Sequence, residues 1–121
     1  MTNNKQNSIT LLANKTCQAC RQGDPILDDQ SVSELLLSIP DWQLNEGQKI
    51  NRIYRFTDFE KTIDFINKVA QIATMNDHHP DVSFGYNYCS ISYSTHAING
   101  LSENDFICAA QIELAFLDQA K

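Results

Sequence analysis

All three histidines of this 121-residue chain lie in one stretch, residues 75–106. His78 and His79 are adjacent and precede Pro80, and His96 follows after two alternating segments. An unperturbed imidazole has a pKa of about 6.5, so both protonation states of such a side chain exist near neutral pH. The grouping therefore favours general acid–base chemistry on an organic substrate.

Two other interpretations of these histidines stay open. Surface histidines and histidines at helix ends are common, and the segment before Pro80 is such an end. A zinc site is the other alternative, but the sequence contains no H-x-H or H-x-x-x-H spacing. Adjacent side chains in an extended segment also point apart, which suits a shared metal poorly. We therefore expect no bound metal.

The chain has four cysteines, and Cys17 and Cys20 form a C-x-x-C motif. No second pair of this kind completes a four-ligand zinc site, and no βαβ pattern supports thioredoxin-like redox chemistry. We interpret the motif as a pair of free thiols, with a metal clip or a redox pair as alternatives. Cys89 and Cys108 fall in a predicted strand and a predicted helix, where small buried thiols are common.

The helices that must position the histidines follow from apolar periodicity and capping residues. Residues 1–28 show no sustained period and are predicted to form a loosely ordered arm that carries the C-x-x-C motif. The first helix is expected to begin at Ser31, which forms a capping box with Glu34. A second box predicts that the longest helix begins at Thr57, and Ser102 is expected to cap the last helix.

Two stretches alternate between apolar and polar residues, as strands with one buried face do. They predict hairpins over residues 42–56 and 82–95. The element order α-β-β-α-β-β-α predicts an α+β two-layer sandwich, with a four-stranded antiparallel sheet and three helices on one face. A single domain over residues 29–121 would contain all of these elements. In such a sandwich the three histidines can meet in one cleft.

Charge and hydrophobicity restrict the partners. The formal net charge is −6 and the sequence pI is about 4.8, and an acidic surface repels the phosphate backbone of nucleic acids. The apolar run at residues 9–13 is too short for a signal peptide or a membrane span, so we expect a cytoplasmic protein. The last predicted helix is apolar on more than one side, which predicts a homo-oligomer, either a dimer or a tetramer.

Several segments of the chain together resemble one known family. The segments "HHPDV", "YN", "STH" and "GLSENDF" follow "IPDWQL" and "YRFTDFEKTIDFINKVA" in this order. Spanning about residues 30–118, they resemble the pterin-4a-carbinolamine dehydratases, also called 4a-hydroxytetrahydrobiopterin dehydratases. The arm segment "CQAC" is similar to the leader of bacterial members.

The resemblance implies an enzyme that removes water from 4a-hydroxytetrahydropterin and releases quinonoid dihydropterin, with no cofactor of its own. This reaction recycles the cofactor of aromatic amino acid hydroxylases, and such a hydroxylase would be a protein partner. The alternative function is a pterin- or protein-binding regulatory module of the dimerisation-cofactor type, with little or no catalysis.

The same resemblance implies roles for particular residues. His78 and His96 would be the acid–base pair, and His79 would hold the pterin or assist. Further contacts to the polar edge of the pterin would come from Asp77, Ser94, Thr95 and Ala97. Asp105 would either orient a histidine or serve as the third residue of its helix, near the positive end of the helix dipole.

One position departs from the family pattern. The family usually has an acidic residue four positions before the first histidine of the pair, and this chain has Thr74 there. A carboxylate one helical turn away could orient His78, which threonine cannot do in the same way. Asp77 or Asp81 would then have to compensate, or activity would be lower.

Overall fold

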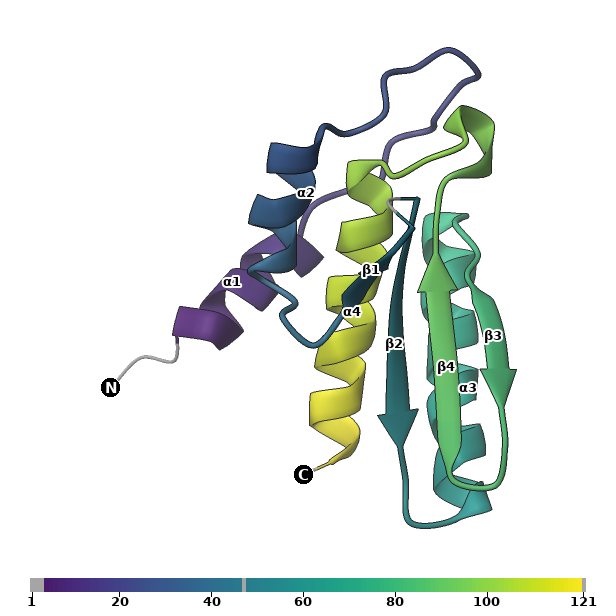
Figure 1. Ribbon diagram of the computed structural model, residues 1–121. Coiled ribbons are helices and arrows are strands. Elements are labelled where there is room, and N and C mark those ends of the chain that lie inside the picture. Colours follow the sequence, from purple (N-terminus) through teal and green to yellow (C-terminus); the bar gives the residue numbers. More distant parts are fainter. Residues whose placement is uncertain (1–3, 47, 121) are drawn as a thin grey trace.

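The computed structural model describes residues 4–46 and 48–120, in which an antiparallel sheet lies against a layer of helices (Figure 1). The strands are β1 (Gln43–Asn45), β2 (Lys49–Arg55), β3 (Asp81–Phe84) and β4 (Tyr88–Tyr93). The helices are α1 (Asn4–Ala13), α2 (Asp29–Leu36), α3 (Phe59–Asn76) and α4 (Glu103–Gln119), with a short 3₁₀ helix, η1 (His96–Ile98). The four strands have the order β1-β2-β4-β3 across the sheet, which confirms the predicted α+β fold and both hairpins.

One face of the sheet is buried and the other meets solvent. Ile50 of β2 and Ile91 of β4 are fully buried, and α3 and α4 cover their face of the sheet (Figure 1). On the opposite face the Asn51 side chain donates hydrogen bonds to the hydroxyls of Ser90 and Ser92. Because alternate residues of a strand point to opposite faces, the period-two pattern of the sequence separates these two environments.

The first residues of α2 and α3 correct the predicted caps. The Asp28 side chain caps α2 by accepting a hydrogen bond from the backbone N–H of Ser31, at 2.8 Å. Ser31 was predicted to be the cap itself, but it lies inside the first turn. Asp58 caps α3 in the same way, one residue after the predicted Thr57. A carboxylate at this position satisfies a backbone N–H that has no partner within the helix.

The prediction of a loosely ordered arm is wrong for the residues that form α1. Ile9, Leu12 and Ala13 are buried where α1 packs against α4. Their spacing places them on one side of the helix, although the stripe is too short to stand out in the sequence. Residues 14–28 are largely irregular, and residues 1–3 of the predicted arm lie outside the described part of the chain.

The position of α1 also explains the wide apolar surface of α4. That surface was the basis for predicting self-association, and α1 now covers part of it within the same chain (Figure 1). The homo-oligomer therefore stays a prediction without this support. No helix in the described residues is long and apolar enough to cross a membrane.

A buried carboxylate connects α4 to the sheet. Glu113 Oε1 accepts hydrogen bonds from Trp42 Nε1 at 3.0 Å and from the Tyr54 hydroxyl at 2.5 Å, and it forms an ion pair with Arg52. Burial, together with the nearby charge of Glu113, raises the pKa of Tyr54 well above its usual value. Each polar group in this cluster thus has a partner inside the core, as buried polar groups require.

Candidate active site

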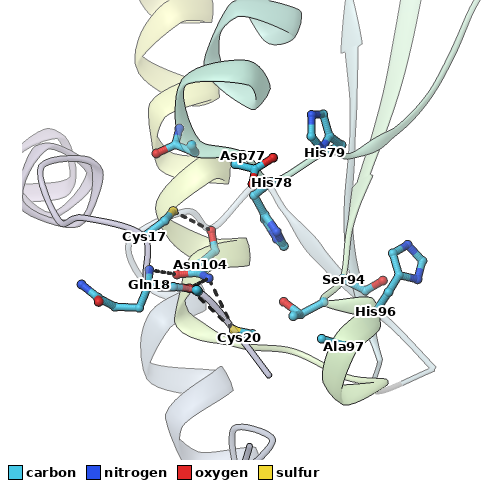
Figure 2. Close-up of a pocket in the computed structure, with 13 residues that line it drawn as sticks. Cys17, Gln18, Cys20, Asp77, His78, His79, Ser94, His96, Ala97 and Asn104 are labelled. Atoms are coloured by element: carbon cyan, nitrogen blue, oxygen red, sulfur yellow. Dashed lines mark hydrogen bonds between the residues drawn. The ribbon is translucent and has the colours of Figure 1, made fainter. Parts of the chain in front are cut away.

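A cavity of about 420 Å³ lies near the end of α3 and the start of α4 (Figure 2). Its walls come from the turn after α3, from the segment that joins β4 to η1, and from the irregular segment after α1. All three histidines line this cavity, and so do the other predicted contact residues Asp77, Ser94, Thr95 and Ala97. The volume falls within the range of about 300–1,000 Å³ that is typical of small-molecule sites.

The end of α3 fixes the backbone of His78. Asp77 has a left-handed conformation, with φ of 49°, and the backbone N–H of His78 donates to the Ala73 carbonyl at 3.1 Å. Aspartate tolerates this conformation better than most residues. The His78 ring stacks on Tyr93, with 5.2 Å between centroids and an interplanar angle of 12°. The Tyr93 hydroxyl also donates to the His78 carbonyl, so both backbone and ring are held.

The carboxylate of Asp105 holds the His78 ring through a ring nitrogen. Nε2 of His78 lies 2.6 Å from Oδ1 of Asp105, whose side chain is fully buried. Oδ2 of Asp105 accepts hydrogen bonds from the Thr95 hydroxyl at 2.9 Å and from the backbone N–H of Ser102 at 3.0 Å. Asp105 therefore contacts a histidine and is also the third residue of a helix capped at Ser102, a position compatible with both of its predicted roles.

This contact constrains the chemistry of His78. When the carboxylate of Asp105 is ionised it can only accept hydrogen bonds, and Nε2 of His78 must then be the donor in this pair. In the neutral ring Nδ1 is then the acceptor. An imidazolium formed by protonation of Nδ1 would remain beside the negative charge of Asp105. The His78 side chain is 14% exposed, which leaves it a limited opening towards the cavity.

His79 and His96 are exposed, and they reach the cavity from different elements. His96 is the first residue of η1, in a loop that is closed by the backbone hydrogen bond from Thr95 N–H to the Gly100 carbonyl at 2.8 Å. Figure 2 shows His78 at the end of the helix, with His79 above it and His96 across from it on another segment. The predicted meeting of the three imidazoles at one cavity is thus observed, whereas their catalytic roles stay predictions.

Thr74 gives His78 no acidic neighbour on its own helix, but a carboxylate from another helix contacts the ring. Thr74 is exposed on α3, and the carboxylate bonded to His78 belongs to Asp105 of α4. Asp77 and Asp81, the two alternatives considered for this role, are both exposed, and the lower activity predicted otherwise stays a prediction. The departure from the family pattern therefore does not leave His78 without a carboxylate.

The sequence showed the C-x-x-C motif, but its position in the wall of the cavity was not predicted. Cys17, Gln18 and Cys20 form part of its wall, and the Asn104 side chain bonds to this segment (Figure 2). Burial raises the pKa of the Cys17 thiol. Within residues 4–46 and 48–120, no group of three or more histidine, cysteine, aspartate or glutamate side chains is arranged to hold a metal ion.

Residues 25–115 match the family described as pterin 4 alpha carbinolamine dehydratase. Two relatives carry pterin-4-alpha-carbinolamine dehydratase as a provisional name. The protein from Nitrosospira multiformis is 43% identical over 109 residues, which cover 90% of this chain and 96% of the relative. The protein from Legionella pneumophila is 39% identical over 109 residues, which cover 88% of this chain and 96% of the relative.

Solved structures agree with this assignment. A protein from Brucella melitensis, described as a transcriptional coactivator/pterin dehydratase, has a TM-score of 0.71 and 30% identity, and covers 74% of this chain and 97% of its own. A pterin dehydratase-like protein described as a RuBisCO assembly factor in the alpha-carboxysome shares the fold, with a TM-score of 0.54, 20% identity, and coverage of 61% and 87%. From its sequence and its fold, this chain belongs to the pterin-4-alpha-carbinolamine dehydratase family.

Proposed function

We propose that this protein removes water from 4a-hydroxytetrahydropterin and releases quinonoid dihydropterin. The observation that carries the proposal is a cavity lined by three histidines, one of which is held by a buried carboxylate. Membership of the dehydratase family supports the same reaction class.

The reaction requires two proton transfers and no change of oxidation state. The bond between C4a and its hydroxyl oxygen breaks as that oxygen gains a proton and leaves as water. N5 loses its proton, and the electron pair of the N–H bond forms the double bond between N5 and C4a. Imidazoles suit both transfers, because each can hold or release a proton near neutral pH.

The geometry around His78 suggests how the two transfers are divided. Nδ1 of His78 accepts the N5 proton, and the resulting imidazolium is stabilised by Asp105, at 2.6 Å from Nε2. His96 comes from a separate element and donates the proton to the leaving hydroxyl, while His79 positions the pterin. Positioned acid–base groups of this kind accelerate reactions by about 10²–10⁴-fold.

The proposal includes the location, the protein partner and the oligomeric state. The product would return, in the cytoplasm, to the cofactor pool of an aromatic amino acid hydroxylase, and the hydroxylase would be a protein partner. A dimer or a tetramer is the expected assembly.

Substitution of the two proposed proton-transfer groups tests the function. With synthetic 4a-hydroxytetrahydropterin, we expect His78→Ala and His96→Ala each to lower the catalysed rate at least about tenfold. Lys49→Ala, an exposed change at the start of β2, is the matched control and should keep full turnover. Circular dichroism establishes that each variant is folded. Unchanged turnover in both histidine variants would reject the assignment.

A second candidate is a binding module with little or no catalysis. Two structural relatives, one described as a coactivator/pterin dehydratase and one as an assembly factor, support this candidate. A pull-down with a purified aromatic amino acid hydroxylase, run beside the dehydration assay, separates the two functions. Binding of the hydroxylase or of a pterin without any turnover would favour the module.

A further inference from the structure

We propose that the segment from Cys17 to Cys20 is a wall of the pterin site and contacts the edge of the pterin opposite the C4a–N5 bond. This inference rests on the proposed function and extends it to a part of the chain outside residues 25–115, which match the family. The segment would then help to decide which pterins fit, while the histidines carry out the proton transfers.

The position of the segment is the first argument. Cys17, Gln18, Ala19 and Cys20 all line the cavity that the histidines line. Figure 2 shows Cys17, Gln18 and Cys20 across the cavity from His96 and Ala97. A flat pterin whose C4a–N5 bond lies beside His96 would therefore turn its opposite edge towards this segment.

The second argument is that the segment is held in place. The Asn104 side chain accepts a hydrogen bond from the Gln18 backbone N–H at 2.9 Å and donates to the carbonyl of the same residue. Its amide also lies 3.5 Å from Cys20 Sγ. Cys17 Sγ lies 3.8 Å from Cys108 Sγ inside the core. A backbone fixed by a buried side chain forms a wall of defined shape, as a preorganised binding site requires.

The third argument is that the first turn of α4 fixes both sides of the cavity. Asn104 and Asp105 are consecutive residues, and they are 8% and 0% exposed. Asn104 holds the Cys17–Cys20 segment, and Asp105 holds His78. One rigid element therefore sets the distance between the Cys17–Cys20 segment and His78. This arrangement suits a ligand that touches both.

Protection of Cys20 from alkylation tests the contact directly. The purified full chain is bound to 7,8-dihydrobiopterin, binding is followed by pterin fluorescence, and iodoacetamide labelling of Cys20 is measured by mass spectrometry. At about ten times the measured Kd only about one tenth of the sites are free, so labelling should slow about tenfold. Cys20 is suitable because it is partly exposed, whereas Cys89 is buried.

A pair of substitutions gives a second readout. Ala19→Leu adds bulk to the proposed wall at an exposed position, and Thr16→Leu adds the same side chain at an exposed position that does not line the cavity. We expect Ala19→Leu to raise KM about fivefold with kcat within about twofold, and Thr16→Leu to change neither.

Two results would overturn the inference, and they are distinguishable. If fluorescence shows that pterin is bound but Cys20 labelling is unchanged, the segment from Cys17 to Cys20 does not contact the pterin, and the proposed function stands. Absence of both pterin binding and turnover removes the proposed function and the inference together.

Discussion

Two buried carboxylates on α4, Glu113 and Asp105, have different surroundings. Glu113 lies in the closed core, paired with Arg52 and hydrogen-bonded to the Tyr54 hydroxyl. Burial lowers the pKa of Arg52, but the hydrogen bond and charge of Glu113, together with Tyr54 and Asp41, raise it overall. Because a guanidinium stays protonated in proteins, the charged partner of Glu113 keeps its charge at physiological pH.

Asp105 lies about two turns earlier, beside the cavity, and its Oδ1 contacts Nε2 of His78. An imidazole can change its charge near neutral pH, and this one also lines a cavity large enough for a small molecule. If the proposed function is right, the comparison means that burial of a carboxylate does not by itself indicate function. The partner must be able to change its charge and to reach a ligand.

The largest expected effect is on stability, at Glu113. Glu113→Ala leaves Arg52 and two buried donors without their acceptor, so the free energy of unfolding should fall by about 3–5 kcal/mol. Urea unfolding measures this loss, and turnover per folded molecule should stay near that of the wild type. A loss of turnover with unchanged stability would mean that Glu113, not only Asp105, supports catalysis.

Asp105→Asn should give the opposite pattern. The amide keeps the shape of the side chain but removes the negative charge beside His78, so kcat should fall at least about tenfold. The isosteric Glu113→Gln is the matched control, because it makes the same chemical change in the closed core. Steady-state kinetics of both variants test the point, and equal losses of kcat would contradict it.

The buried thiols provide a third kind of environment, in which ionisation affects stability alone. Burial raises the pKa of Cys89 from 9.0 to about 11. The folded state therefore keeps this proton after the unfolded state has lost it. The resulting stabilisation is complete below about pH 9 and is lost as the pH approaches 11, at up to about 1.4 kcal/mol per pH unit.

Cys89→Ala should remove this contribution. Urea unfolding at pH 8, 9 and 10 should show a shallower decline for the variant than for the wild type. Parallel curves for the two proteins would show that the Cys89 thiol does not ionise differently on unfolding.

The smallest expected effect is at Thr95, whose hydroxyl donates to Asp105. Thr95→Val keeps the shape of the side chain and removes two hydrogen bonds, one to Asp105 and one shared with the Ser102 hydroxyl, which should cost about 1–2 kcal/mol of stability. Because Ser102 still donates to the same carboxylate oxygen, kcat should fall less than in Asp105→Asn. A loss of kcat as large as that of Asp105→Asn would mean that Thr95 has a direct catalytic role.

Local pattern was enough to predict much of the fold. Alternation and capping located both hairpins and the last helix, because these features depend on neighbouring residues. The start of α2 was missed because Asp28 and Ser31, three residues apart, are both good capping residues. The short helix α1 was missed because isolated helices of this length are marginal and depend on packing, here against α4.

The site was predictable only in part, because some of its contacts also depend on packing between distant segments. The order of the elements indicated that His78 and His96 could meet, since each follows the end of an element. The contact between His78 and Asp105 joins side chains 27 residues apart, and Gln18 lies 86 residues from Asn104. Such contacts depend on how α3, α4 and the N-terminal segment pack together, which local periodicity does not contain.

The most direct test is the rate at which purified protein dehydrates synthetic 4a-hydroxytetrahydropterin, compared with the spontaneous reaction and with His78→Ala. We predict a clear acceleration by the wild type that falls at least about tenfold in the variant, while both proteins bind 7,8-dihydrobiopterin. A wild-type rate equal to the spontaneous rate, or a variant as fast as the wild type, would contradict the proposed role of the imidazole held by Asp105.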